Sequence, residues 1–166
     1  MSSINKILIA NRGEIAIRII EACHELGIEA VAVYSTADKD MPHVELADES
    51  YCIGPPDSQE SYLSFPAVMS AADISGADAV HPGYGFLAEN AHFAEVCEDH
   101  GIQFIGPPSG ILELAGNKVK AKEKAEKLGV SVLPGSFEPI SNKEVLKKEA
   151  SRLGYPLIIK AALGGG

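Results

Sequence analysis

The segment at residues 157–166 combines a lysine with a run of glycines and is suited to binding phosphate. Lys160 closes an apolar stretch with the pattern of a buried strand, where an ammonium group is costly to desolvate unless an anion neutralises it. Backbone N–H groups of the glycines that follow can approach phosphate oxygens closely. Together these features suit a nucleoside triphosphate, although the segment lacks the Gly-Lys-Ser/Thr of a P-loop. The alternative is a surface strand followed by glycines that bind no ligand.

A second candidate segment, His81–Asn90, contains the sequence Gly-Tyr-Gly-Phe directly after a predicted strand. The glycines on both sides of Tyr84 allow the backbone to turn sharply and to come close to a ligand. Asn90 can cap the next helix, and Glu89 suits its positive end, so a structural explanation suffices for these two residues. That explanation does not account for two glycines and two aromatic residues together, and we interpret the segment as a binding loop.

The turn at residues 11–14 argues against a dinucleotide cofactor. Its sequence, Asn-Arg-Gly-Glu, holds one glycine, whereas a dinucleotide site places three there as GxGxxG. We interpret Arg12 as a structural residue that ties down the sheet edge or faces a partner domain. His81, at a strand end before a proline, is interpreted as a packed histidine, and we predict no metal site within the chain.

Alternating apolar patterns predict the elements that position these loops. Short runs rich in Ile and Val predict buried parallel strands at 6–10, 29–34, 79–81 and 103–105, with a weaker candidate at 51–53. Helical spacing predicts helices at 15–26, 66–75 and 90–100. This order gives right-handed βαβ units, and therefore an α/β fold with an open parallel, Rossmann-like sheet and helices on both faces. The loops at 11–14 and 82–90 then meet at the carboxyl edge of the sheet, where such folds bind ligands.

A second region begins after the Gly-Pro-Pro-Ser break at 106–109. We expect a charged helix at 118–128, a helix at 141–153 capped by Ser141 with Glu144 in a capping box, and a strand at 157–161. The predicted domains are a complete α/β domain at 1–106, linker helices at 107–131 and the start of a further domain at 132–166. An apolar strand followed by terminal glycines leads us to expect that the sequence belongs to a longer chain.

The composition excludes several classes of partner. The net charge is −9, from 14 basic and 23 acidic residues, which argues against nucleic acid and against an anionic membrane surface. No apolar run approaches the roughly 20 residues that a membrane span needs. The three cysteines form no CxxC pair, so disulfide and zinc frameworks are not expected, and we predict a cytoplasmic location.

In this order and spacing, the segments resemble the biotin carboxylases, which serve acetyl-CoA carboxylase, pyruvate carboxylase and related enzymes. The resemblance extends from Lys6 to the last residue and is carried by KILIANRGEIAIRII, HPGYGFLAEN, GNKVKAK and GYPLIIKA. It implies an N-terminal α/β domain (pre-ATP-grasp), a linker and the start of an ATP-grasp lid domain. The implied reaction uses ATP and bicarbonate to form carboxyphosphate and then carboxylates biotin on a carrier protein. This chain alone is expected to be inactive, since most catalytic residues of the family belong to a C-terminal domain.

The resemblance also assigns roles to residues and names cofactors and partners. The residues that match ATP contacts are Lys118, Lys160, Gly164, Gly165 and Gly166. Those that match the loop near the biotin pocket are Gly83, Tyr84 and Gly85, with Glu89 close to it as the one catalytic candidate, and Arg18 matches a position at a dimer interface. The implied cofactors are ATP, Mg²⁺ or Mn²⁺ with ligands outside this chain, and biotin. The implied partners are a biotin carboxyl carrier protein, a carboxyltransferase subunit and, in the full-length form, a second copy.

The sequence departs from the family pattern at three positions. Asn117 stands where Asp is frequent, which we expect to be tolerated, and Ala88 stands where Ser is usual. Glu21 replaces a basic residue of the dimer contact, which puts the usual pairing there in doubt. Two other interpretations stay open: another ATP-grasp ligase, such as a purine-pathway carboxylase, and a non-enzymatic α/β module that binds a nucleotide or a protein.

Overall fold

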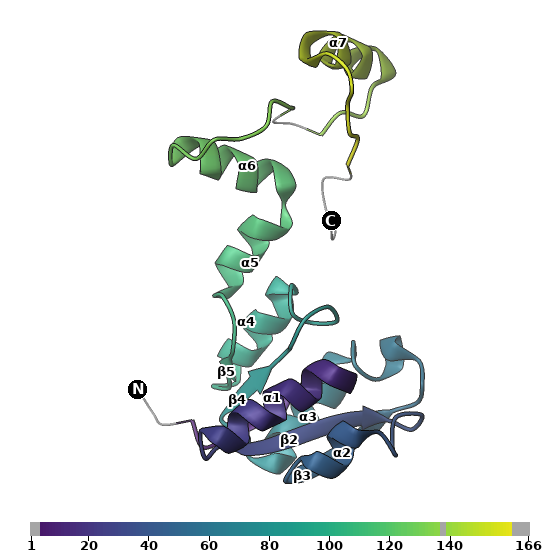
Figure 1. Ribbon diagram of the computed structural model, residues 1–166, viewed down its shortest axis with the longest axis vertical. Helices are drawn as coiled ribbons and strands as arrows, with labels where there is room; N and C mark the ends of the chain where they lie inside the picture. Colours follow the sequence, from purple (N-terminus) through teal and green to yellow (C-terminus); the bar gives the residue numbers. More distant parts are fainter. Residues whose placement is uncertain (1–3, 137–138, 161–166) are drawn as a thin grey trace. The chain divides into compact units, whose positions relative to one another are not determined.

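A computed structural model describes residues 4–136 and 139–160 of the chain (Figure 1). Contacts divide the chain into two compact units, Met1–Ser109 and Gly110–Gly166. Within the described residues, no helix has both the length and the apolar character needed to cross a membrane.

The first unit is built on a sheet of five strands in the order β3-β2-β1-β4-β5. The strands are β1 (Lys6–Ile9), β2 (Glu29–Ser35), β3 (Glu49–Gly54), β4 (Ala79–His81) and β5 (Gln103–Phe104). Every neighbouring pair is parallel, which confirms the predicted α/β fold. Both faces of the central strands are covered, and β1, β2 and β4 are almost wholly buried, which explains their nearly continuous apolar sequences.

Helices cover both faces of this sheet. They are α1 (Gly13–Glu25), α2 (Pro42–Leu46), α3 (Phe65–Ser75) and α4 (Ala91–Asp99). In Figure 1, α1 lies in front of the strands and α3 lies behind them. Their placement follows from right-handed crossovers, because the chain steps from β1 to β3 in one direction and then returns past β1 to β4.

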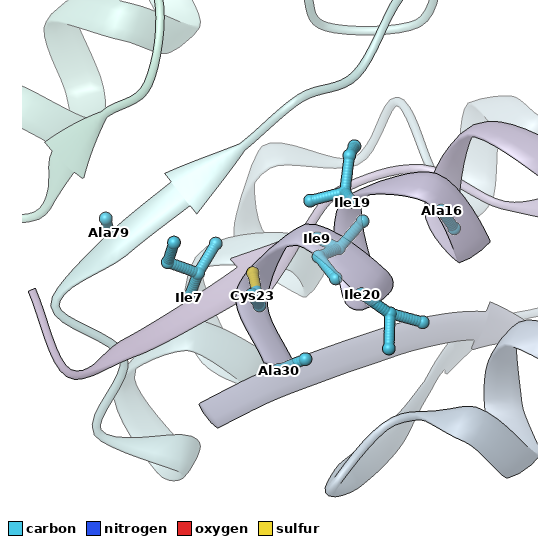
Figure 2. Packing of buried hydrophobic residues seen from close by; sticks show 8 residues of the cluster. All are labelled: Ile7, Ile9, Ala16, Ile19, Ile20, Cys23, Ala30 and Ala79. Atoms are coloured by element: carbon cyan, nitrogen blue, oxygen red, sulfur yellow. The ribbon is translucent and has the colours of Figure 1, made fainter. Parts of the chain in front are cut away.

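The face under α1 holds a compact apolar cluster. Ile7 and Ile9 of β1 project toward Ala16, Ile19, Ile20 and Cys23 of α1, with Ala30 and Ala79 from the two neighbouring strands completing the contact (Figure 2). The spacing 16, 19, 20 and 23 follows the helical repeat, so one stripe of α1 is buried. On the other face, α3 and α4 meet through the rings of Phe65 and Phe93, whose centroids lie 5.2 Å apart.

Three features of the first unit differ from the sequence prediction. The edge strand β3 is longer than the predicted 51–53, since it begins at Glu49 and ends at Gly54. Helix α2 was not predicted, because five residues, the first of them a proline, are too few to show a helical repeat. A short 3₁₀ turn at Ser58–Glu60, capped by the Asp57 side chain, was also missed.

The second unit contains α6 (Lys118–Lys127) and α7 (Lys143–Leu153), and α5 (Ser109–Gly116) spans the boundary. Helix α5 lies within the linker helices expected at 107–131, although its bounds were not predicted, because its eight residues carry glycines that weaken the helical pattern. The predicted cap of α7 is wrong by one residue. Asn142, and not Ser141, caps the helix, and its side-chain oxygen accepts a hydrogen bond from the Glu144 N–H at 2.7 Å.

The strand predicted at 157–161 is wrong over its described part. Residues 157–160 form no strand, and Ile158 and Ile159 are 82% and 79% exposed. An apolar β-branched run becomes a strand only when a neighbouring strand bonds its backbone, and none does so in the described part of the second unit. Ala161 lies outside the described residues.

Candidate functional site

The carboxyl edge of β1 and β4 is the point where the sheet order reverses. From β1 the chain moves to β2 and β3, and it later returns to place β4 on the other side of β1. Open α/β sheets bind ligands beyond the strand ends at such a point. Here the turn after β1 and the loop after β4 form a hollow of about 410 Å³ lined by Asn11, Arg12, Gly13, Glu14, Ile15, Tyr84, Gly85 and Phe86. The two loops predicted to converge therefore do so.

Asn11 joins the two loops. Its side-chain amide donates hydrogen bonds to the backbone oxygens of Pro82, at 2.8 Å, and Tyr84, at 2.7 Å. Its oxygen accepts from the N–H of Arg12 at 2.9 Å. Asn11 is 4% exposed, and its bond to Pro82 is buried, where a hydrogen bond is stronger than at a surface; the bonds to Tyr84 and from Arg12 are partly buried. The sequence analysis did not predict this role for Asn11.

Gly83 lies directly against Asn11. Its φ of +65° is in the left-handed region, and a Cβ built on it would lie 2.8 Å from Asn11 Nδ2. The Gly83 N–H donates to His81 Nδ1 at 3.0 Å, and burial lowers the pKa of His81, which keeps that ring neutral and able to accept. The prediction that His81 is a packed residue fits this contact.

Tyr84 stands at the mouth of the hollow. Its side chain is 60% exposed, and its hydroxyl donates to Glu14 Oε1 at 2.6 Å. The hydrogen bond to Glu14 raises the pKa of the Tyr84 phenol, and the negative charge of the carboxylate raises it further. The phenol is therefore neutral at physiological pH and offers a ring that a ligand can reach.

Replacing Glu14 with glutamine is expected to lower the pKa of Tyr84 toward its ordinary value, because the two largest causes of the shift, a hydrogen bond and a negative charge, come from the Glu14 carboxylate. NMR titration of the tyrosine rings would measure the change. Tyr51 is the internal control, since a hydrogen bond to Glu49 raises its pKa and the substitution leaves that contact intact. An unchanged Tyr84 titration would show that the Glu14 contact is not formed in solution.

Arg12 fixes the far side of the same loop. Its guanidinium lies 5.1 Å from the ring centre of Tyr62 and 5.6 Å from that of Phe86, and the two rings stack on each other with centroids 5.0 Å apart. Phe86 has a φ of +29°, rare for a side chain of this size, so the stack holds a backbone geometry that would otherwise relax. The structural role expected for Arg12 matches these contacts.

Asp38, three residues after β2, anchors Arg12 at 3.0 Å. Its Oδ2 also accepts from Ser35 Oγ at 2.6 Å and from the Tyr62 hydroxyl at 2.8 Å. Burial by itself raises the pKa of Asp38, but the hydrogen bonds from Ser35, Tyr62 and Arg12 outweigh it and hold the pKa below its ordinary value. Burial also raises the pKa of Tyr62, so its phenol stays neutral and donates.

The remaining predicted residues lie elsewhere. Glu89 is exposed and precedes α4, which Asn90 caps by accepting from the Phe93 N–H at 2.9 Å. Arg18 lies on α1 with its side chain 73% exposed and pairs with Glu21 at 2.9 Å. The replacement noted at position 21 therefore gives Arg18 an acidic neighbour on its own helix.

The predicted phosphate contacts belong to the second unit. Lys118 is the first residue of α6, and Asn117 caps that helix by accepting from the N–H groups of Val119 and Lys120 at 3.1 Å each. The Asn at position 117 therefore works as a helix cap. Lys160 does not end a buried strand, which removes the desolvation argument for an anion there. Gly164, Gly165 and Gly166 lie outside the described residues.

Comparison with known proteins identifies two family matches. The model for "Biotin carboxylase, N-terminal domain" matches residues 3–112, and that for "Carbamoyl-phosphate synthase L chain, ATP binding domain" matches residues 117–166. The biotin carboxylase of Haemophilus influenzae is 57% identical over 98% of this chain, and biotin carboxylase 1 of Bacillus subtilis is 55% identical over 98%. The chain spans 37% and 36% of the length of these two relatives.

Solved structures give the same result. The biotin carboxylase domain dimer of Hydrogenobacter thermophilus 2-oxoglutarate carboxylase, in complex with MgADP, ADP and bicarbonate, is 46% identical with a TM-score of 0.95 and covers 100% of this chain. Biotin carboxylase from Campylobacter jejuni, in complex with β-γ-ATP, is 51% identical with a TM-score of 0.95 and covers 99%. This chain spans 36% and 37% of those chains.

Proposed function

Because the chain belongs to the biotin carboxylase family, we propose that it forms the N-terminal part of an ATP-dependent biotin carboxylase. In the proposed reaction, bicarbonate attacks the γ-phosphorus of ATP and gives carboxyphosphate and ADP. The carboxyl group then passes to a ureido nitrogen of biotin, which loses its proton, and phosphate is released. The observation that carries this proposal is the loop at 83–86, which Asn11 and Arg12 hold beside an open hollow at the switch point of the sheet.

Within this function we assign the biotin side to Gly83, Tyr84 and Gly85. The support is geometric, since two glycines leave the backbone accessible and Tyr84 presents an exposed, neutral phenol. Glu89 remains the one candidate for acid–base chemistry in this chain. For Arg18 we propose a place at an interface between two copies, in line with the dimer described for the Hydrogenobacter domain.

The ATP contacts are proposed for the second unit and rest on the family resemblance. They comprise Lys118, Lys160, Gly164, Gly165 and Gly166. Among residues 4–136 and 139–160, no group of three or more His, Cys, Asp or Glu side chains could hold a metal ion. On the family resemblance, we propose that the ligands of the Mg²⁺ or Mn²⁺ that accompanies ATP come from outside this chain.

The proposed organisation keeps the boundaries 1–106 for the N-terminal domain, 107–131 for the linker helices and 132–166 for the start of the ATP-grasp lid domain. We propose a biotin carboxyl carrier protein and a carboxyltransferase subunit as partners, since biotin must be presented by one and used by the other. A cytoplasmic location is proposed on the three free cysteines, Cys23, Cys52 and Cys97.

The test is ATP cleavage by the full-length protein that carries this sequence. We expect phosphate release that requires bicarbonate and is stimulated by free biotin, because carboxyphosphate forms only with bicarbonate and is consumed when biotin takes up its carboxyl group. Omission of bicarbonate is the control. Bicarbonate-dependent cleavage without stimulation by biotin would contradict the proposal and favour another ATP-grasp ligase. Tight ATP binding to residues 1–166 alone, measured by calorimetry, would instead favour a self-contained nucleotide-binding module.

A further inference from the structure

The side-chain amide of Asn11 is committed entirely to the loop that carries Tyr84 and to the turn it belongs to. Both of its N–H bonds point at backbone oxygens on the two sides of Gly83, at Pro82 and Tyr84. An asparagine amide has two donor hydrogens, so no donor is left for any other group. We propose that Asn11 is a positioning residue that sets where Tyr84 stands over the biotin side of the site. This inference rests on the proposed function.

The loop needs such a residue because its own sequence does not fix its path. Gly83 and Gly85 have φ values of +65° and +66°, and glycine moves between such conformations at little cost. Tyr84, between them, is tied at its hydroxyl to Glu14, but that bond is exposed to water and holds weakly. The bond from Asn11 to the Pro82 oxygen is buried and the bond to the Tyr84 oxygen is partly buried, so both are better shielded from water than the Tyr84 hydroxyl, and they hold the backbone from which the Tyr84 ring projects.

Asn11 is held in place by the buried strand that precedes it. It follows the buried end of β1, where Ile9 and Ala10 are 0% and 1% exposed, and the Ala10 N–H donates to the His81 oxygen at 2.9 Å. The Asn11 side chain therefore fixes the position of the loop relative to the paired strands β1 and β4. A displacement of about 1 Å in a binding group can cost roughly 100-fold in rate. Loss of the Asn11 contacts is therefore expected to impair function at the site.

If Asn11 only fills space, a different result is expected. Substitution by aspartate distinguishes this packing role from a role as a hydrogen-bond donor. Asp has nearly the shape of Asn, but an ionised Asp side chain can only accept hydrogen bonds and cannot donate them. One of its oxygens would therefore face the carbonyl oxygens of Pro82 and Tyr84 at the present 2.7–2.8 Å. A packing role predicts that Asn11→Asp resembles the wild type and that Asn11→Ala is worse. A donor role predicts that Asn11→Asp is at least as harmful as Asn11→Ala.

The experiment compares the full-length wild-type enzyme with Asn11→Ala, Asn11→Asp and Ser75→Ala, using free biotin as the substrate. Ser75 is the control, because it is a buried polar residue whose hydroxyl bonds only within α3, to the Ala72 oxygen. We expect both Asn11 variants to raise the KM for biotin by roughly 10- to 100-fold, with the KM for ATP unchanged, and Ser75→Ala to keep the wild-type biotin KM. A wild-type biotin KM in Asn11→Asp would overturn the proposal, whatever the KM of Asn11→Ala.

Hydrogen exchange of the peptide covering residues 82–90 gives a readout that does not depend on activity. Exchange should be faster in both Asn11 variants than in wild type and Ser75→Ala, while peptides from α1 keep their protection. If wild-type enzyme shows no stimulation by biotin, the proposed function fails, yet faster exchange still assigns Asn11 to the loop. Unchanged exchange in both variants would overturn the positioning role whatever the activity.

Discussion

Replacing Asp38 with alanine is expected to lower the free energy of unfolding by about 3 kcal/mol, because two buried hydroxyls lose their acceptor at once. Ser35 and Tyr62 are 0% and 1% exposed, and both donate to Asp38 Oδ2. Arg12 also loses its ion pair, but its side chain is 41% exposed and water replaces part of that contact. Urea unfolding monitored by circular dichroism would measure the loss. Asp73→Ala, at an exposed position on α3, is the control and should change stability by less than about 0.5 kcal/mol.

The same residue gives a signed pH dependence. The pKa of Asp38 in the folded chain lies below its ordinary value of 3.8, so the folded state favours the carboxylate. The contribution of the charge is therefore fully present above pH 3.8 and is lost as the pH falls through the folded value. The difference in unfolding free energy between wild type and Asp38→Asn should be constant near neutral pH and should shrink in acid. A difference that grows as the pH is lowered would show that the hydrogen bonds to Asp38 do not favour its ionised form.

Gly54→Ala should also cost about 3 kcal/mol, for a reason of shape. Gly54 ends β3 with a φ of +145°, and a Cβ there would overlap the backbone oxygen of Glu60. Backbone cannot move aside as a flexible side chain can, so the 3₁₀ turn at 58–60 would have to shift. Gly76→Ala is the matched control, since Gly76 has a φ of +66° but no atom within 4 Å of the added Cβ.

For Gly76→Ala we expect a loss of about 1 kcal/mol, which is the conformational cost alone. The difference between the two alanine variants then isolates the overlap with Glu60. Equal losses in the two variants, measured by the same urea unfolding, would contradict the crowding at Gly54.

The sheet could be predicted from sequence because its central strands are buried on both faces. Runs such as Lys6–Ile9 and Ala79–His81 are short and apolar, and the intervening helices show a clear repeat. The prediction failed where the local sequence pattern does not determine the structure that the chain adopts. Residues 157–160 have strand composition but no bonded neighbour in the described chain, and α2 is too short to show periodicity.

The site was predictable only in part, for a different reason. The two glycines around Tyr84 predicted a binding loop, since a simple turn does not need them. The side chains that hold the loop carry no local signal, because Asn11 lies 71 and 73 positions from its partners in the sequence. Asp38 and Tyr62 are likewise separated by 24 positions. One general rule could have found them: polar residues just beyond the carboxyl ends of adjacent parallel strands lie together.

The central place of β1 has a consequence for synthesis of the chain. Residues Ile7–Ile9 pair with Ala30–Ala32 on one side and with Ala79–His81 on the other, so the first strand of the sheet is completed by the fourth. After β1 is synthesised, about 70 further residues are translated before β4 begins, roughly 4–14 s at usual rates. The edge of β1 that pairs with β4 therefore stays open during this time. The unpaired backbone groups of this edge are a template for wrong pairing, so misfolding is favoured during this interval.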